Sequence, residues 1–168
     1  LMRRQNGIVI AIVKDVNDPA GEGRIQLEYP WLPGSPPSGW APVAVPLAGK
    51  DRGMWYMPEP GDQAVVAFEQ GDFDHPFVVG FVWDGVQVPP DEDPRLRLIK
   101  SLNDHRIEIY DPDEAQGDRG YLRFEDAHGN MIEMANARIT IRSVARLEIQ
   151  APTVTINGRP VAPVPNPI

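Results

Sequence analysis

The stretch from Ile132 to Ile156 reads IEMANARITIRSVARLEIQAPTVTI and carries one short pattern four times. Each repeat is an apolar pair two residues apart with a polar residue between its members, and the pairs begin 7, 8 and 7 residues apart. This pattern indicates very short strands with one buried face, each followed by a turn and stacked as rungs. The pairs are Ile132/Met134, Ile139/Ile141, Leu147/Ile149 and Val154/Ile156.

A lone chain cannot close a core with strands that each offer two apolar side chains. The apolar pairs would be buried if several identical chains wound together and turned these pairs toward a shared axis. Two earlier apolar pairs fit the same scheme. The predicted axis core is therefore Ile107, Ile109, Leu122, Phe124, Ile132, Met134, Ile139, Ile141, Leu147, Ile149, Val154 and Ile156.

Composition favours an all-β protein. The 168 residues include 19 prolines and 15 glycines, and almost no window shows apolar residues at helical spacing. The net charge of −8 argues against nucleic acid and anionic membrane surfaces as partners. The chain has no cysteine, which excludes disulfides and thiolate metal sites. No targeting segment is visible, since the apolar run at the start is far too short to cross a bilayer.

The first half predicts five strands at regular spacing, separated by turn-forming residues. They are Ile8–Lys14, Arg24–Tyr29, Ala41–Pro46, Gln63–Phe68 and Phe77–Trp83. The first is nearly all apolar, as expected of a strand buried on both faces. Five strands in about 80 residues fit a small closed barrel of the OB type. Any helix between the third and fourth strands would be short.

The expected domains follow from these patterns and from the prolines between them. Residues 1–83 form the OB-type barrel, and residues 84–104 form a linker that contains Pro89-Pro90 and an acidic run. Residues 105–158 form the shaft with its stacked rungs. Residues 159–168 (RPVAPVPNPI) leave the ladder as an extended C-terminal segment, because proline cannot donate to it.

Residues 57–80, MPEPGDQAVVAFEQGDFDHPFVVG, resemble the OB domain of baseplate spike proteins. These are the central spikes of contractile phage tails and the VgrG proteins of type VI secretion and extracellular injection systems. Gly23–Leu27 and Trp40–Val43 are similar to the second and third strands of that domain. The resemblance implies a barrel collar followed by a trimeric, intertwined, triple-stranded β-helix that serves as a needle.

The motif residues themselves are explained by turn geometry. Pro fixes φ, Gly adopts conformations that other residues avoid, and Asp accepts hydrogen bonds from nearby amides. We expect an architectural role for Pro60, Gly61, Asp62, Gly71, Asp72, Pro76 and Gly80.

Features of the family that this sequence lacks indicate which partner proteins it would need. No hub domain precedes Gly7, so either a separate hub protein joins the N-terminal side or the chain is an excerpt of a hub–spike fusion. No lysozyme domain separates barrel and needle. The His-x-His motif that binds iron at some spike tips is absent, so the resemblance implies a PAAR-like tip protein and no cofactor. Its predicted docking residues are Val154, Ile156, Asn157, Gly158, Arg159 and Val161.

Catalysis has little support in the sequence. The acidic residues lie in turns or in the linker, and His75, His105 and His128 lack the partners that activate a nucleophile. The acidic run Asp111–Glu114 lacks the ligand spacing of a calcium loop. Five aromatic residues could either stack on a ligand or fill barrel ends and subunit contacts, and we favour the second. They are Trp31, Trp40, Trp55, Tyr56 and Trp83.

The leading hypothesis is a non-enzymatic, homotrimeric spike that joins hub to tip and pierces the target cell envelope mechanically. It would be located in a baseplate, be assembled in the bacterial cytoplasm and touch the target membrane transiently. The alternative is an OB-fold module that binds oligosaccharide or protein, with an oligomerisation stalk. A cell-wall-degrading enzyme is a third and weaker reading. Phage tail, type VI apparatus and extracellular injection system stay open, as do target cell and cargo.

Overall fold

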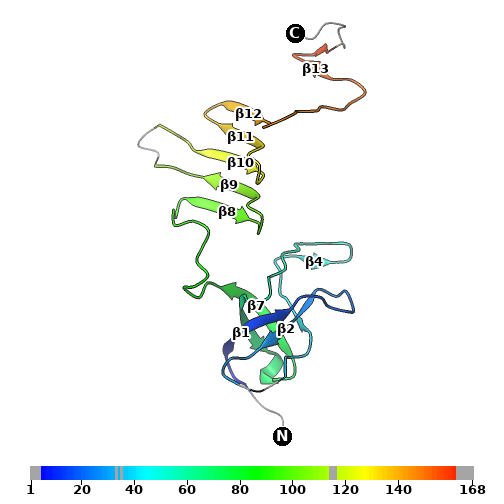
Figure 1. Cartoon of the computed structure of the whole chain (residues 1–168), viewed down its shortest axis with the longest axis vertical. Helices are drawn as coiled ribbons and strands as arrows, with labels where there is room; N and C mark the ends of the chain where they lie inside the picture. Colours follow the sequence, from blue (N-terminus) through cyan, green and yellow to red (C-terminus); the bar gives the residue numbers. More distant parts are fainter. Residues whose placement is uncertain (1–4, 33, 35, 114–116, 162–168) are drawn as a thin grey trace. The chain divides into compact units, whose positions relative to one another are not determined.

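The computed structural model describes residues 5–32, 34, 36–113 and 117–161, and the chain divides between Pro89 and Pro90 into two compact units. Apart from one short helical turn, every regular element in the described residues is a strand (Figure 1). The expectation of an all-β chain is therefore confirmed for this part of the protein.

The first unit is a curled, antiparallel five-stranded sheet with the order β3-β2-β1-β6-β7. Its strands are β1 (Ile8–Asp15), β2 (Arg24–Glu28), β3 (Ala41–Pro42), β6 (Gln63–Phe68) and β7 (Pro76–Val82). An isolated parallel bridge between Val43 and Val78 brings the β3 end of the sheet back to β7. A curled sheet of this order is consistent with an OB-type domain.

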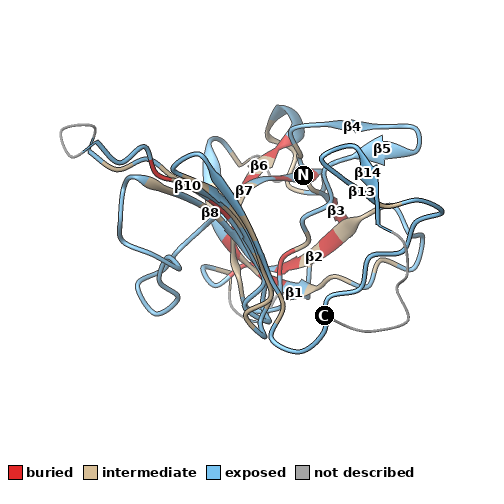
Figure 2. Cartoon of the chain, turned by 90° about the horizontal axis from the view of Figure 1, so that it is seen from above, coloured by how far each residue is buried: buried red, intermediate tan, exposed pale blue. Residues whose placement is uncertain are grey.

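Alternation along these strands builds the core. Strand β6 alternates half-buried and buried residues without a break, and Ala64, Val66 and Phe68 point inward. Ile25 and Leu27 of β2 are fully buried beside them. Strand β1 differs from the expectation of a strand covered on both faces, because Ala11 and Val13 are buried while Ile8 and Ile10 are exposed. Figure 2 shows buried residues gathered in the strands of this unit.

The segment between β3 and β6 contains a small hairpin that the sequence did not predict. It pairs β4 (Ala48–Gly49) with β5 (Arg52–Gly53), and no helix forms in the described residues of this segment. The helical turn in the described residues, η1 (Glu69–Gly71), follows β6 instead. Strand β3 is also shorter than the predicted Ala41–Pro46, because after Pro42 the chain leaves β2 and Val43 bridges Val78 of β7.

The second unit is an antiparallel meander of five strands followed by a small hairpin. The meander contains β8 (Leu96–Lys100), β9 (Arg106–Tyr110), β10 (Tyr121–Glu125), β11 (Met131–Ala135) and β12 (Arg138–Arg142). The hairpin pairs β13 (Thr155–Ile156) with β14 (Arg159–Pro160). Strand β8 lies inside the predicted linker 84–104, so the regular structure of this unit begins earlier than expected.

The predicted intertwined β-helix is not seen in the single chain. From Leu96 to Arg142 each strand pairs with its neighbour in the same chain, and a two-residue turn at Asn136 and Ala137 joins β11 to β12. The predicted rung at Leu147/Ile149 is not a strand in this structure. The extended segment expected from Arg159 begins with a strand, β14, and residues 162–168 lie outside the described part of the chain.

Candidate functional site

The meander of the second unit separates its side chains into an apolar face and a charged face. Because antiparallel partners point to the same side, the register aligns the predicted apolar pairs from strand to strand. One row is Ile99, Ile107, Phe124, Ile132 and Ile141, and the other is Arg97, Ile109, Leu122, Met134 and Ile139. Eight of the predicted axis residues are thereby brought together on one face.

This apolar face is open in the single chain. The eight predicted axis residues on it are 40 to 68% exposed, whereas Glu108 on the opposite face is only 4% exposed. A soluble sheet with one covered face buries its apolar side and leaves its charged side in water. The apolar face is therefore the more exposed face of this sheet in the single chain, and a contiguous exposed apolar surface is typical of an interaction site.

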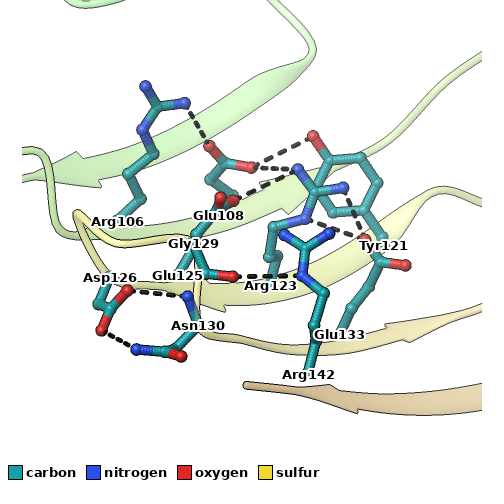
Figure 3. Close-up of polar contacts among 10 residues, drawn as sticks. All are labelled: Arg106, Glu108, Tyr121, Arg123, Glu125, Asp126, Gly129, Asn130, Glu133 and Arg142. Atoms are coloured by element: carbon teal, nitrogen blue, oxygen red, sulfur yellow. Dashed lines mark hydrogen bonds and ion pairs between the residues drawn. The ribbon is translucent and has the colours of Figure 1, made fainter. Parts of the chain in front are cut away.

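The charged face holds a connected ion network (Figure 3). The Arg123 guanidinium donates from Nη2 to Glu133 Oε2 at 2.6 Å and lies 3.5 Å from Glu108 Oε2. Arg106 contacts the other oxygen of Glu108 at 3.5 Å, and the Tyr121 hydroxyl lies 3.3 Å from Glu108 Oε2. These residues are cross-strand partners or near neighbours, so opposite charges stabilise the register.

The network shifts the pKa values of two of its members, Arg123 and Tyr121. Burial lowers the pKa of Arg123, but the hydrogen bond with Glu133 and the nearby negative charges outweigh it, so the pKa is raised overall. Burial, with the charge of Glu108, raises the pKa of Tyr121. The Arg123 guanidinium also lies 4.2 Å above the Tyr121 ring, a cation–π contact. Both raised pKa values keep Arg123 charged and Tyr121 neutral at neutral pH, which suits a structural role.

A hollow of about 700 Å³ lies on the apolar face, where the chain leaves β12. Its lining includes Ile107, Phe124, Ile132 and Ile141 from the sheet and Leu147 from the segment that follows it. The hollow therefore belongs to the same surface as the two apolar rows and extends that surface toward residues 143–148.

The segment between β12 and β13 is irregular in this structure. Residues 143–154 form no strand, although Leu147 and Ile149 keep the apolar spacing and are exposed. The segment is held to the meander at its start, where the Val144 amide donates to Asn130 Oδ1 at 2.9 Å. The predicted axis residues Leu147 and Ile149 are thus not aligned with the eight on the meander.

The predicted tip-docking residues lie in the C-terminal hairpin. Ile156 pairs with Arg159, and the Val161 amide donates to the Val154 carbonyl oxygen at 2.7 Å. Asn157 and Gly158 form the turn with φ values of 50° and 73°, the geometry that an Asn-Gly hairpin turn requires. Pro160 therefore does not leave the ladder directly. It lies opposite Thr155 at an edge, where a missing amide is tolerated.

The motif residues of the first unit occupy turns and a bulge. Gly61 has a φ of 102°, and Asp62 Oδ2 accepts from the Glu59 amide at 2.9 Å, which caps the residue before the turn rather than the strand after it. Gly71 has a φ of 80°, and Asp72 Oδ1 accepts from the Asp74 amide at 3.1 Å.

Pro76 and Gly80 lie in β7. Pro76 is buried at the start of the strand opposite Phe68. Gly80 lies opposite Val65 beside a register shift, because Val66 pairs with Val78 and Val79 is left over. A β-bulge of this kind sharpens the local twist and helps a sheet to curl.

The aromatic residues do not form a ligand platform in the described structure. Of the five residues considered, only Trp31 makes ring contacts there, with Tyr29 and Phe73. These rings and Phe68 pack together in the first unit, with the Tyr29 and Phe73 centroids 5.1 Å apart. Sequence reasoning missed Tyr29, Phe68 and Phe73, which are spread over three segments. Burial raises the pKa of Tyr29 to about 12.

No group of three or more potential metal ligands occurs among the described residues, and no helix there is long and apolar enough to span a membrane. His75 Nδ1 lies 3.0 Å from Asp72 Oδ2 within one exposed turn. His105 Nδ1 lies 3.3 Å from the Ala127 amide, also at the surface. Neither contact brings a nucleophile and a base together.

Residues 9–83 match the family described as the type VI secretion system/phage-baseplate injector OB domain. The chain is also 28% identical over 114 residues to the type VI secretion system spike protein VgrG3 of Vibrio cholerae serotype O1, an alignment that covers 64% of this chain. It spans about a tenth of the length of that relative. These matches confirm the resemblance to baseplate spike proteins, which are structural components of injection machines.

Proposed function

We propose that this chain is the homotrimeric, non-enzymatic spike of a contractile injection machine, with the barrel as a collar and residues 105–158 as the needle. The open apolar face of the meander carries the proposal. Two rows of apolar side chains are aligned across four or five strands, and their predicted axis residues are 40 to 68% exposed. Three such faces turned inward around one axis would cover one another and leave the charged faces in water.

Burial of these rows would stabilise the assembly. Each square ångström of apolar surface removed from water contributes roughly 25 cal/mol, so a row of Ile, Leu, Phe and Met side chains adds several kcal/mol for each chain. The residues that would face the axis are Ile107, Ile109, Leu122, Phe124, Ile132, Met134, Ile139 and Ile141, followed by Leu147, Ile149, Val154 and Ile156 farther along the chain.

The irregular segment after β12 fits the second part of such a needle. Leu147 and Ile149 have strand spacing but no strand partner among the described residues. The outer edge of β12 carries no further strand in the meander, which ends there. A segment with strand spacing but no strand partner, next to an open sheet edge, favours pairing between chains. We propose that the needle begins with sheets formed within each chain and continues, after Arg142, with strands that pair between copies.

The charged face would supply lateral rigidity on the outside of the needle. Arg123 holds Glu108 and Glu133 from two neighbouring strands, so sliding one strand past the next breaks two ion pairs. Inside, paired amides and apolar rows resist bending. Under this proposal sheath contraction drives the tube, and the needle transmits the force to the target envelope without chemical catalysis.

Partners at both ends complete the proposal. A hub protein would hold the collar, and a PAAR-like tip would cover the last rung through Val154, Ile156 and Val161 beside the Asn157–Arg159 turn. Exposed apolar residues in this hairpin, including Ile156 and Val161, support such a cover. Co-purification tests it: deletion of residues 152–168 should abolish retention of the tip protein and keep the hub. Equal retention of the tip would place its docking site elsewhere.

The proposed location is the distal end of a baseplate assembled in the bacterial cytoplasm, with membrane contact only during piercing. Labelling of intact particles with an antibody against this chain should mark the baseplate end. Label along the sheath or tube, or none on particles, would contradict that position.

Sedimentation equilibrium tests the central part of this proposal. The full chain at micromolar concentration should have three times the 18.7 kDa mass of one copy. A species of 18.7 kDa at that concentration would contradict the spike function, because a lone chain leaves its apolar face in water.

A further inference from the structure

The chain contains two Asn-Gly pairs, Asn6-Gly7 and Asn157-Gly158, and the structure holds them differently. In such a pair the glycine amide nitrogen can attack the carbonyl carbon of the asparagine side chain, because glycine has no Cβ atom to crowd the approach. The attack needs a backbone that can rearrange around the asparagine. Whether it occurs at a given pair therefore depends on how firmly the flanking residues are held.

Asn157-Gly158 forms the turn of a very small hairpin. Its strands, β13 and β14, contain two residues each, and one further hydrogen bond joins the Val161 amide to the Val154 carbonyl oxygen. Pro160, in β14, has no amide to donate. A two-stranded hairpin of this size is marginally stable by itself, so it opens locally while the rest of the chain stays folded.

The two reacting groups at this turn are not held by other groups. Among the described residues, neither the Asn157 side chain nor the Gly158 amide has a hydrogen-bond partner, and both residues are exposed. Asn130 shows the opposite arrangement. Its Nδ2 donates to Asp126 Oδ2 at 2.7 Å, and its Oδ1 accepts from the Val144 amide at 2.9 Å. The Asn157 side chain is thus free to turn toward the Gly158 nitrogen when the hairpin opens.

Asn6-Gly7 is fixed on both sides. The Gln5 amide donates to the Gly71 carbonyl oxygen at 2.8 Å. Ile8 begins β1, an eight-residue strand that pairs with both β2 and β6. Rearrangement around Asn6 therefore breaks bonds to the first unit, and opening a strand of a folded core costs far more than opening a small hairpin.

We propose that Asn157 is a site of spontaneous modification, at which the side-chain amide is converted to a mixture of aspartate and isoaspartate. The Gly158 nitrogen forms a bond to Asn157 Cγ and loses its proton, while the Cγ–Nδ2 bond breaks and ammonia leaves. A water molecule then opens the resulting cyclic imide. Attack of water at Cγ gives aspartate, and attack at the main-chain carbonyl carbon gives isoaspartate.

Both products change the hairpin. Aspartate tolerates the left-handed conformation of Asn157, whose φ is 50°, and adds a negative charge two residues before Arg159. Isoaspartate adds one carbon atom to the main chain, so the two-residue turn no longer aligns β13 with β14. Under the proposed function this hairpin is the tip-docking segment, and a chain that ages without a tip would lose docking sites. That consequence rests on the proposed function, whereas the modification itself does not.

The two Asn-Gly pairs provide a matched test within one molecule. The full-length chain is incubated at mildly alkaline pH, because the attacking nitrogen must lose its proton, and a parallel sample is incubated in denaturant. Peptide mapping by mass spectrometry follows conversion of amide to acid. In denaturant, Asn6 and Asn157 should convert at similar rates. In the native chain, Asn157 should convert at least about tenfold faster than Asn6, because its hairpin opens more easily.

Two further positions serve as controls. Asn130, whose side chain is bound at both ends, should stay unconverted in the native chain. Asn157→Gln should remove conversion from its peptide, since the longer side chain would have to close a larger ring. Equal native rates at Asn6 and Asn157, or a native Asn157 that stays unconverted, would overturn the proposal and leave the proposed function standing. Equal retention of the tip protein by aged and fresh chains would overturn the docking consequence alone.

Discussion

Ile132 and Ile141 are cross-strand partners on β11 and β12, and both point to the open apolar face of the meander. They lie nine positions apart in a stretch whose apolar pairs begin seven residues apart, because the Asn136–Ala137 turn folds the second pair back onto the first in reverse order. Ile132 therefore meets Ile141, and Met134 meets Ile139. The apolar side chains of the repeat thus form two straight rows across one face of the sheet. Such rows can be buried along a shared axis between chains.

The turn between these strands contains a strained residue. Ala137 has a φ of 60°, a left-handed conformation that costs an L-residue with a Cβ atom roughly 1 kcal/mol. Ala137→Gly should therefore raise the free energy of unfolding by about 1 kcal/mol, measured by far-UV circular dichroism in denaturant. The matched control, Ala135→Gly at the end of β11, should lower it. Equal effects of both changes would contradict the strain argument.

Arg123 is the centre of the charged face. Arg123→Met removes one of the two cations at the nearly buried Glu108, which keeps Arg106 and the Tyr121 hydroxyl, and it frees Glu133, so the second unit should lose about 2 kcal/mol of stability. All four tryptophans lie in the first unit, so tryptophan emission follows that unit alone. The circular dichroism transition should shift while the tryptophan transition stays.

A second substitution checks the cause of that loss. Addition of Glu108→Gln to Arg123→Met removes the stranded charge and should restore part of the stability. A double variant as unstable as the sum of both single changes would mean that Arg123 acts through packing rather than through its charge.

Acid should destabilise the first unit through its β1–β2 loop. Asp18 accepts hydrogen bonds from Arg24 and from three backbone amides, and the Arg24 contact above all holds the pKa of Asp18 far below its usual value. A lowered folded-state pKa contributes stability that is present above the ordinary value near 3.8 and is lost as the pH falls toward the folded-state value.

The melting temperature, followed by tryptophan emission, should thus fall steadily below about pH 4.5. Asp18→Asn should start lower and show a shallower decline, since the variant has no proton to gain there. Identical pH profiles for parent and variant would exclude Asp18 as a source of acid sensitivity. Asp72, whose pKa is lowered by the Asp74 amide and by His75, should contribute in the same direction.

The boundary between the two units should tolerate insertion. Three to five Gly/Ser residues between Pro90 and Asp91 should leave both transitions in place, because lengthening a flexible connection changes its closure entropy by well under ~1 kcal/mol. The same insert between Asn136 and Ala137 serves as the control and should destabilise the second unit by breaking its two-residue turn. Loss of both transitions on insertion at Pro90 would show that the boundary packs as part of a core.

Much of the first unit could be predicted from period-two alternation. Gln63–Phe68 is a strand with the predicted bounds, and Arg24–Glu28 lies within one residue of its prediction. The β4–β5 hairpin was missed because its strands contain two residues each and no alternation. Strand β8 was missed because LRLIK begins only two residues after Pro94, next to the acidic run, and breaks strict alternation at its end.

The sequence could not specify which strand each strand of the second unit pairs with. An apolar–polar–apolar pattern tells which side chains share a face, but it is identical whether the neighbouring strand comes from the same chain or from another. The sequence carried only a weak indication of the Glu108–Arg123–Glu133 network, namely opposite charges at the middle positions of successive strands. Without the register, those charges could not be assigned to one another.

The most direct test of the account compares aspartate on the two faces of one strand. Ile141 lies on the apolar face of β12 and its neighbour Thr140 lies on the charged face, opposite Glu133. If three copies bury the apolar face, Ile141→Asp places three carboxylates on a dry axis at several kcal/mol for each charge. Light scattering should then find Ile141→Asp monomeric or aggregated at a concentration where parent and Thr140→Asp are trimeric. An Ile141→Asp chain that assembles and melts like the Thr140→Asp chain would contradict the buried axis, and with it the spike.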